Sequence, residues 1–540
     1  MPVHHQSSGS AFCGRFNVAE PMNGVLIFVS ILTVFLAVYS IAHYFCTAVV
    51  LFTRQRPRTD FSYPSDSVAV LIPARNEGGC AHRAISSLLA QDHKGSIDIY
   101  LLVKDKEDTA IAVFEESFPE VDFSLPVGSI CRMVTTKNRT ASVVYVGVDP
   151  KSAKVNWITG RLKTTYSAIL DCDHQAHPDW IRTSICLMSE KKARIVQGRR
   201  QPISAHGFFQ LWDSLQQHIG CELFNAAFAR MGLSVFFTGT TVVMDTELLQ
   251  SRPLSACITE DTDFSYGIFL EGVVMINNPY SGSDEETSPD VYSFLARRRR
   301  WANGHTESFV RHLPKLFSAP ISFASRIQFF FHGAHYLIAL VVFALHLAIS
   351  LVFLAELSAV SIVASTLLSL MLSGWLARTQ GTMGWAAKLF ELTVLFGWIF
   401  PAVVIVMNLT QAVLMNDFSR AVLPIHPALQ VLGLVGFCAP LAVLLGGLAR
   451  FRQLGVGSLI AVVSSYIFAF YLDISGVLLG MADYVFGGAR WRPVHRGDFE
   501  LLDVVSDPRE LLPAYGIKDS WRLRPVLSSA RRVLPRVYGK

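Results

Sequence analysis

The feature that most limits what this chain can fold into is a stretch of 29 residues, Gly24 to Phe52, without one Asp, Glu, Lys or Arg. A helix needs about 20 apolar residues to cross a hydrocarbon core about 30 Å thick. The stretch is too long for the apolar region of a signal peptide, and no basic segment precedes it. It predicts an uncleaved transmembrane anchor at residues 24–52, with residues 1–23 as an external N-terminal segment.

Further apolar runs predict a multispan region of about five helices over residues 332–487. The runs occupy residues 334–357, 358–377, 389–414, 425–448 and 455–479. Residues 313–331 mix aromatic residues with prolines and charges, which favours an interfacial helix. Arg56 and Arg58 follow the anchor, so the positive-inside rule places the next domain in the cytoplasm.

The C-terminal tail, residues 488–540, carries 11 Lys or Arg against 6 Asp or Glu from residue 490 onward. A basic tail also prefers the cytoplasm. Five spans after a cytoplasmic domain would leave it outside, so the number of spans stays open. In either case we expect a multi-pass protein of the cell membrane.

Composition narrows the class of protein. Only 16% of the 540 residues are charged, against about 25% in an ordinary soluble domain. A purely soluble protein and a disordered chain are therefore excluded. The formal net charge of +5 is weak for this length and gives no reason to expect nucleic acid as a partner.

Residues 60–312 read like a soluble α/β domain, because short apolar runs alternate with amphipathic stretches. The pattern predicts strands at 67–73, 97–103 and 166–170, and a helix at 80–90. This is typical of a doubly wound, mostly parallel sheet. In such sheets ligands bind at the carboxyl ends of the strands, so we looked for chemistry after each strand.

Acidic residues follow two of these strands. Asp105 comes after the second, where a solvated charged turn is the commoner explanation. Asp171 and Asp173 come after the third, and alternating carboxylates there could hold a hard divalent cation. Asp261 lies in a Thr-Glu-Asp sequence, which suits either a general base or the N-terminus of a helix.

An arginine run precedes the multispan region. Four arginines, residues 297–300, are followed by Trp301. Taken alone, such a run favours a face that contacts solvent or lipid headgroups.

In order along the chain, these features resemble the motif series of membrane-embedded family 2 glycosyltransferases. The series is completed by Leu71–Glu77 (LIPARNE), Phe236–Thr240 (FFTGT) and Arg297-x-x-Arg300-Trp301. The resemblance is greatest to cellulose-synthase-like processive polysaccharide synthases. It implies a cytoplasmic GT-A domain inserted between the anchor and the C-terminal helices. It also implies inverting transfer from a UDP-sugar, UDP-glucose being the best guess, to a growing β-linked polysaccharide that is conducted across the bilayer.

The resemblance implies a role for each matching residue. Asp261 would be the catalytic base, and Asp171 and Asp173 would hold Mg²⁺ or Mn²⁺ on the diphosphate. The residues that would bind the nucleotide sugar are Arg75, Glu77, Asp105, Lys154, Asp171, Arg297 and Arg300. Those that would bind the acceptor are Phe237, Thr238, Gly239, Thr240 and Trp301.

The sequence departs from the family pattern at two positions. Lys104 replaces the first of the usual paired aspartates, and Arg297 stands where many relatives have glutamine. Two alternatives stay open: a non-processive transferase that glycosylates a membrane lipid such as ceramide, and a non-enzymatic transporter, since ionisable residues occur in the apolar runs. The FFTGT segment and the C-terminal apolar runs favour the polymer synthase.

Overall fold

The computed structural model describes residues 19–486, apart from residues 54, 79, 137, 203–207, 379–383 and 451–455. Most of the predicted external segment and the whole tail, 488–540, therefore lie outside the described residues. The chain divides into two units. The first is Met1–Tyr39 with Val341–Phe437, and the second is Ser40–Leu340 with Cys438–Lys540.

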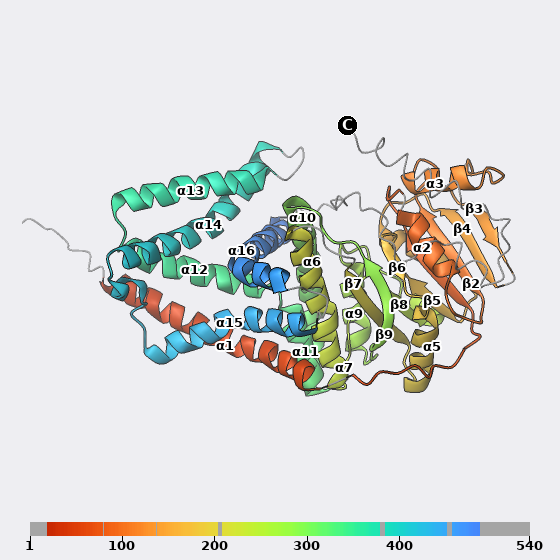
Figure 1. The fold of residues 1–540 in the computed structure, drawn as a ribbon, viewed down its shortest axis with the longest axis horizontal. Coiled ribbons are helices and arrows are strands. Elements are labelled where there is room, and N and C mark those ends of the chain that lie inside the picture. Colours follow the sequence, from red (N-terminus) through yellow and green to blue (C-terminus); the bar gives the residue numbers. More distant parts are fainter. Residues whose placement is uncertain are drawn as a thin grey trace, which may run out of the picture. The chain divides into compact units, whose positions relative to one another are not determined.

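The second unit is built on one mixed sheet, whose nine described strands run in the order β3-β4-β2-β1-β5-β8-β7-β9-β6 (Figure 1). The strands are β1 (Val68–Pro73), β2 (Ile97–Val103), β3 (Ile130–Thr135), β4 (Arg139–Tyr145), β5 (Tyr166–Ile169), β6 (His174–Ala176), β7 (Ile195–Pro202), β8 (Val242–Asp245) and β9 (Ile276–Glu285). The three predicted strands are confirmed as β1, β2 and β5, each within one residue at either end.

The centre of the sheet is parallel. Strands β4, β2, β1 and β5 pair in parallel, whereas β8 runs antiparallel to both β5 and β7. The residues of β1 are almost all buried, because a parallel strand is covered on both faces. The carboxyl ends of β1, β2 and β5 therefore meet at one edge.

Helices cover both faces of this sheet. On one face, α2 (Cys80–Leu89), α3 (Thr109–Ser117) and α5 (Trp180–Lys191) form a single core with alternate strand residues such as Val68 and Val70. Outside that core, α4 (Lys151–Thr159) packs on β1 and β2, and α8 (Thr246–Ser251) packs on β5 and β8. Since successive strand residues point to opposite faces, the doubly wound arrangement predicted from the sequence is present.

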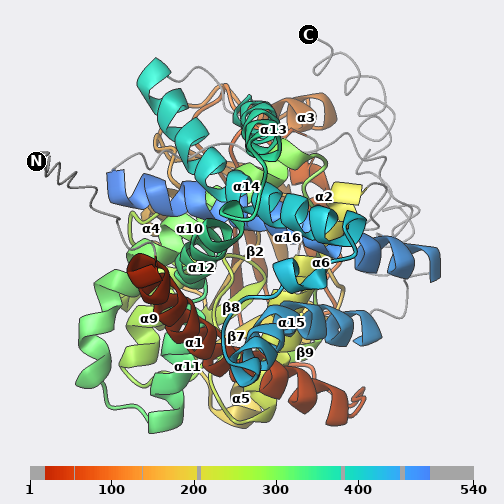
Figure 2. The same ribbon diagram turned by 90° about the vertical axis from the view of Figure 1, so that its left-hand side faces the viewer.

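The second unit continues into helices beyond the sheet. They include α6 (Phe208–His218), the π-helix η1 (Ile219–Phe224), α7 (Asn225–Arg230), α9 (Glu260–Leu270), α10 (Val291–His312) and α16 (Val456–Phe486). Helix α10 packs along α16, the long blue helix in Figure 2. A helix that follows the last strand of the sheet is thereby joined to the last described helix of the chain.

Long apolar helices flank the sheet in sequence. Those that could cross a membrane lie in α1 (Ala19–Phe52), α13 (Ala359–Ala377), α14 (Trp385–Leu414), α15 (Pro427–Arg450) and α16. A sixth is possible where α11 (Phe323–Gly333) meets α12 (Ile338–Leu354) at a bend of 58°. The first unit, which contains most of these helices, has a core of Val352, Phe353, Leu357 and Val404.

The predicted interfacial helix over 313–331 is not one helix. A short 3-10 helix, Leu313–Phe317, ends before Pro320, and α11 then starts at Phe323. Proline cannot supply the N–H that would continue a helix. Ser322 restarts it, because its hydroxyl accepts the Ser325 N–H at 3.1 Å.

Candidate active site

The predicted metal-binding aspartates lie just beyond the carboxyl end of β5. That strand ends at Ile169, and the chain passes through Asp171 and Asp173 into β6 at His174. The Asp171 N–H donates to Thr240 Oγ1 at 2.8 Å, in the loop that leads into β8. The end of β5 and the FFTGT loop are thereby fixed to each other.

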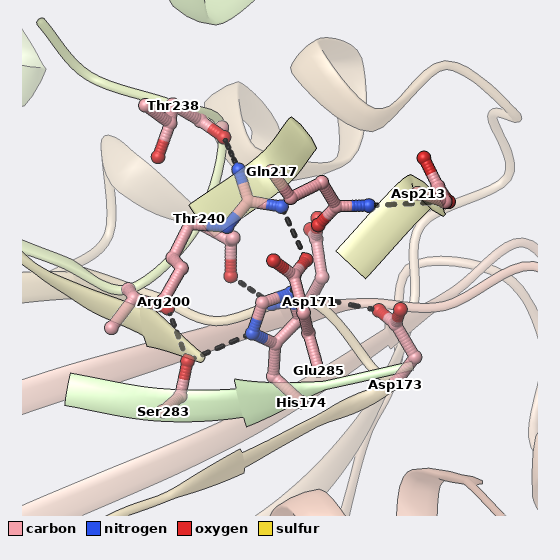
Figure 3. Close-up of polar contacts among 12 residues, drawn as sticks. Asp171, Asp173, His174, Arg200, Asp213, Gln217, Thr238, Thr240, Ser283 and Glu285 are labelled. Carbon is pink, nitrogen blue, oxygen red and sulfur yellow. Dashed lines mark hydrogen bonds and ion pairs between the residues drawn. The ribbon is translucent and has the colours of Figure 1, made fainter. Parts of the chain in front are cut away.

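Asp171, Asp173 and His174 form a group whose donor atoms lie within 4.8 Å of one another. The His174 ring is oriented by Ser283, whose Oγ lies 2.8 Å from Nδ1 (Figure 3). Its Nε2 lies 3.4 Å from Glu285, so both ring nitrogens have protein partners and the two aspartates are the expected ligands. The carboxylate oxygens of the two aspartates suit both Mg²⁺ and Mn²⁺. The donor set therefore fits a divalent cation, as predicted from the two aspartates.

An ion-pair network of Glu285 and Arg200 holds His174 of this group in place. Glu285 stands opposite His174 in the β6–β9 pair, and its carboxylate lies 3.4 Å from His174 Nε2. Arg200 pairs with Glu285 and donates to the Thr238 carbonyl at 2.9 Å (Figure 3). Burial alone would raise the pKa of Glu285, but Arg200 and His174 hold it below its usual value. Glu285 is therefore ionised and ties β6, β7 and the FFTGT loop together.

Lys151, at the start of α4, links the metal group to the acidic end of α9. Its Nζ lies 2.6 Å from Asp171 Oδ1 and 3.5 Å from Glu260 Oε1, and it donates to the Gly239 carbonyl at 2.7 Å. Burial opposes the charge, but Asp171 and Glu260 raise the pKa of Lys151. A fixed ammonium group therefore stands between the two sets of carboxylates.

Lys154, the residue predicted to neutralise the diphosphate, points elsewhere. It lies three residues further along α4, is only 1% exposed, and donates to the Ala74 carbonyl at 2.5 Å. Burial lowers the pKa of Lys154. The structure thus brings Lys151, not Lys154, to Asp171.

Asp261, the predicted base, lies in the first turn of α9 and is half-buried. Its Oδ1 accepts the Thr262 N–H at 2.8 Å. Burial raises the pKa of Asp261, against the opposing effect of Lys151, and raises that of the neighbouring Glu260 to about 7. A carboxylate with a raised pKa is a better proton acceptor near neutral pH.

Gly239 lets the FFTGT loop pass close to this base. The glycine has φ of +87°, and a Cβ placed on it would lie 3.0 Å from Asp261 Oδ2. Phe237 is 2% exposed and packs edge-on against Phe264, and Thr240 is fully buried. The loop therefore contributes backbone carbonyls to Lys151 and Arg200, while the Phe237 ring lies in the core. The acceptor role predicted for Phe237, Thr238, Gly239 and Thr240 stays a prediction.

The residues predicted to contact the nucleotide lie at the ends of β1 and β2. Arg75 is exposed, with its Nε 3.9 Å from Asp149. Asp105 accepts the Glu107 N–H at 3.0 Å and is partly exposed. Glu77 is half-buried and hydrogen-bonds Cys172, between the two metal-site aspartates.

Sequence reasoning missed Asp108. This buried side chain accepts the N–H groups of Asn76 and Ala110, both at 3.0 Å. It therefore joins the loop after β1 to the start of α3. The signal in the sequence was Asp108 itself, because aspartate is a preferred residue immediately before a helix.

The arginine run is not a solvated face. Arg297, Arg298 and Arg299 are all buried, each against an acid. Arg297 pairs with Asp213 at 2.8 Å, and Arg298 pairs with Asp473 at 2.6 Å. Arg299 donates to Asp483 at 2.6 Å.

Trp301 is half-buried beside this run, and the Arg298 guanidinium carbon lies 4.9 Å from its ring centroid. Arg300 is half-buried on the same helix. The donor and acceptor roles predicted for Arg297, Arg300 and Trp301 stay predictions.

We expect Asp213→Asn to destabilise the fold strongly. Asp213 is fully buried, contacts Arg297 and Arg298, and accepts the Ser288 N–H at 2.7 Å. Removing one partner of a buried ion pair costs about 3–5 kcal/mol. Thermal unfolding of the purified protein in lipid nanodiscs measures the change. The control is Asp60→Asn, whose exposed carboxylate also pairs with an arginine; equal melting of the two variants would contradict the prediction.

The chain was compared with protein families, with curated proteins and with solved structures. The sequence profile described as glycosyl transferase family group 2 matches residues 168–472. A search of curated proteins gives no match. Among solved structures, the chain is similar to the mannosyltransferase PcManGT from Pyrobaculum calidifontis in complex with GDP-Man and Mn²⁺, with 13% identity, a TM-score of 0.45, and coverage of 77% of this chain and 99% of that one. It is also similar to S. aureus TarS 1-349, with 10% identity, a TM-score of 0.33, and coverage of 69% and 91%.

Proposed function

Because the chain belongs to glycosyl transferase family group 2, we propose that it is an inverting hexosyltransferase that extends a β-linked polysaccharide from a UDP-sugar, with UDP-glucose as our first choice of donor. One observation carries this proposal. Asp171, Asp173 and His174 form a group suited to a divalent cation. Lys151 pairs with Asp171 of this group and with Glu260, in the acidic turn that also holds Asp261.

Asp261 and Lys151 have separate roles in the proposed reaction. Asp261 takes the proton from the acceptor hydroxyl as that oxygen bonds to the anomeric carbon of the sugar. The bond from this carbon to the diphosphate oxygen breaks, and UDP leaves with the electron pair. Attack opposite the leaving group inverts the anomeric centre. Lys151 supplies a fixed positive charge beside the place where negative charge develops.

A divalent cation, Mg²⁺ or Mn²⁺, would be held by Asp171 and Asp173, with His174 beside them. When bound, it would supply charge neutralisation for the diphosphate leaving group. Ser283 and Glu285 contact the two ring nitrogens of His174, so the imidazole supports the aspartates and does not itself hold the cation.

Three features of the chain support a polymer product and its export. The motif series resembles that of processive synthases, Trp301 is half-buried on α10 beside the arginines, and several helices are long enough to cross a membrane. The basic flank after α1 favours a cytoplasmic position for the sheet and a cell-membrane location. A transferase acting on a membrane lipid would need the same acidic residues, so the product decides between the two.

We expect purified protein given one UDP-sugar at a time to make a glycosidase-sensitive product of many units from one of them. Trp301→Ala should lose this product almost entirely, because positioning of the chain end supplies several kcal/mol of effective molarity. The control is Trp157→Ala, another tryptophan with an arginine over its ring, at 3.8 Å. Radiolabelled products are separated by size and by solvent extraction.

One outcome would count against the polymer proposal, and another against the role of Trp301. If the labelled product extracts into organic solvent as a monoglycosyl lipid, the chain is a lipid glycosyltransferase. If Trp301→Ala makes polymer at the wild-type rate, Trp301 does not hold the acceptor.

A further inference from the structure

A group of imidazole and phenol side chains lies next to the proposed base. We call it the histidine patch and define it as His305, His332, His335 and Tyr336. His305 lies on α10 four residues after Trp301, so the two share one face of the helix. His332 is in α11, and His335 and Tyr336 are in the bend between α11 and α12.

Side-chain contacts connect the patch to Asp261. His305 Nε2 lies 3.1 Å from Thr262 Oγ1, and the Thr262 N–H donates to Asp261. The ring centroid of His305 is 5.1 Å from that of Tyr336 and 6.0 Å from that of His332. The patch therefore begins one residue from the group that would take the acceptor proton.

Every member of the patch keeps some exposed surface. His335 is exposed, and His305, His332, Tyr336 and Asp261 are half-buried. On its inner side the patch is fixed, since the Tyr266 hydroxyl lies 2.8 Å from His332 Nδ1. These side chains are thus held in place while keeping accessible surface.

The patch suits an uncharged ligand. Burial, with a smaller contribution from His335, lowers the pKa of His305 to about 3, so this imidazole is neutral at physiological pH. A neutral imidazole has one donor and one acceptor nitrogen, and a phenol can do both. Hydroxyl groups of a sugar need that mixture.

Three nearby arginines carry compensated charge. Arg297, Arg298 and Arg299 each pair with an aspartate, at positions 213, 473 and 483. Recognition of a phosphate normally uses guanidinium or ammonium groups that can bind it directly. These three guanidinium groups are thus already engaged by carboxylates, which favours a neutral ligand over a lipid phosphate.

We propose that the histidine patch is an acceptor subsite, in which imidazole and phenol groups hydrogen-bond the hydroxyls of a neutral sugar and hold its reacting hydroxyl against Asp261. This inference rests on the proposed function and narrows it. The acceptor is the uncharged, hydroxyl-rich end of a glycan, not an anionic lipid. His305 is a binding residue here, and Trp301, one turn away, covers the sugar ring.

The test compares acceptor use with donor use in the full-length protein in nanodiscs. The donor is the UDP-sugar on which the wild type is active, and the acceptor probe is a soluble β-linked glucose tetramer. His305→Phe keeps an aromatic ring but loses both nitrogens, and should raise the acceptor KM about 10-fold, the effect of one lost hydrogen bond. The affinity for UDP and the slow hydrolysis of the donor by water should stay within about 2-fold, since neither uses this subsite.

Two further variants keep the test decisive. His305→Gln retains a donor and an acceptor and should recover part of the acceptor affinity. His335→Phe changes an exposed side chain and should raise the acceptor KM even if His305→Phe fails to fold. The matched control, His426→Phe, changes an exposed histidine of the other unit and should alter neither constant.

An unchanged acceptor KM in folded His305→Phe and His335→Phe overturns the subsite. Transfer by the wild type to a polyprenyl phosphate but not to the glucose tetramer overturns the neutral acceptor. A different result would contradict the proposed function itself. In that case the wild-type protein would neither hydrolyse nor transfer sugar from any nucleotide donor.

Discussion

Asp261→Asn is expected to lower the rate of sugar transfer by about 10²- to 10⁴-fold, the usual contribution of a general base. The amide keeps the size of the side chain, and its oxygen can still accept the Thr262 N–H. It cannot take the proton of the acceptor hydroxyl. Affinity for UDP should stay within a few-fold, because the side chain acts on the acceptor.

The control is Asp263→Asn, two residues along the same helix. That carboxylate is bound by Arg311 at 2.9 Å and by His312 at 3.1 Å, so it should leave the transfer rate close to that of the wild type. The pH profile gives a second readout. Burial raises the pKa of Asp261. As the pH is lowered, the base should therefore become protonated, and wild-type activity should fall, at a higher pH than an ordinary aspartate would give. Near-normal turnover of Asp261→Asn would remove this residue from the mechanism.

Asp173→Ala should abolish the part of UDP-sugar affinity that depends on a divalent cation. Changing a residue that only hydrogen-bonds a metal ligand already costs about 10- to 100-fold in affinity, so the loss of a ligand should reach about 100-fold or more. Calorimetric titration of UDP with Mn²⁺, and again with EDTA, measures the difference.

Asp284→Ala is the matched control, because this carboxylate lies next to Glu285 but pairs with His177 at 3.0 Å. It should retain cation-dependent binding. Wild-type binding that is indifferent to EDTA would show that Asp171 and Asp173 do not hold a cation.

The acidic residues could be predicted because their signal is local. Asp171 and Asp173 directly follow an apolar strand, and parallel strands carry their ligands at that end. Asp261 lies at the start of a helix, as its Thr-Glu-Asp sequence indicated. The strands and most apolar helices were predictable for the same reason, since hydrophobic periodicity is readable over a few residues.

The remaining parts of the site depend on tertiary packing. Lys151 and Lys154 are both basic residues of one helix, and only the packing of α4 on β1 and β2 decides which of them reaches Asp171. Arg200 and Glu285 come from two different strands, so no sequence window contains their ion pair.

The burial of the arginine run could not be predicted, for the same reason. Its acidic partners lie far away in sequence: Arg299 and Asp483 are separated by 184 residues. The charges looked uncompensated only because the partners are on another helix.

These long-range pairs cannot form until the last described helix has been synthesised. Arg298 and Arg299 leave the ribosome long before α16, the helix that holds Asp473 and Asp483. An aspartate near the middle of an apolar helix costs about 2.5–3.5 kcal/mol on insertion into a membrane, and pairing with an arginine offsets this cost. A fragment that stops before α16 would contain the whole sheet and Asp261, yet lack the carboxylates that neutralise the centre of α10. The last described helix to be made therefore completes the domain that precedes it.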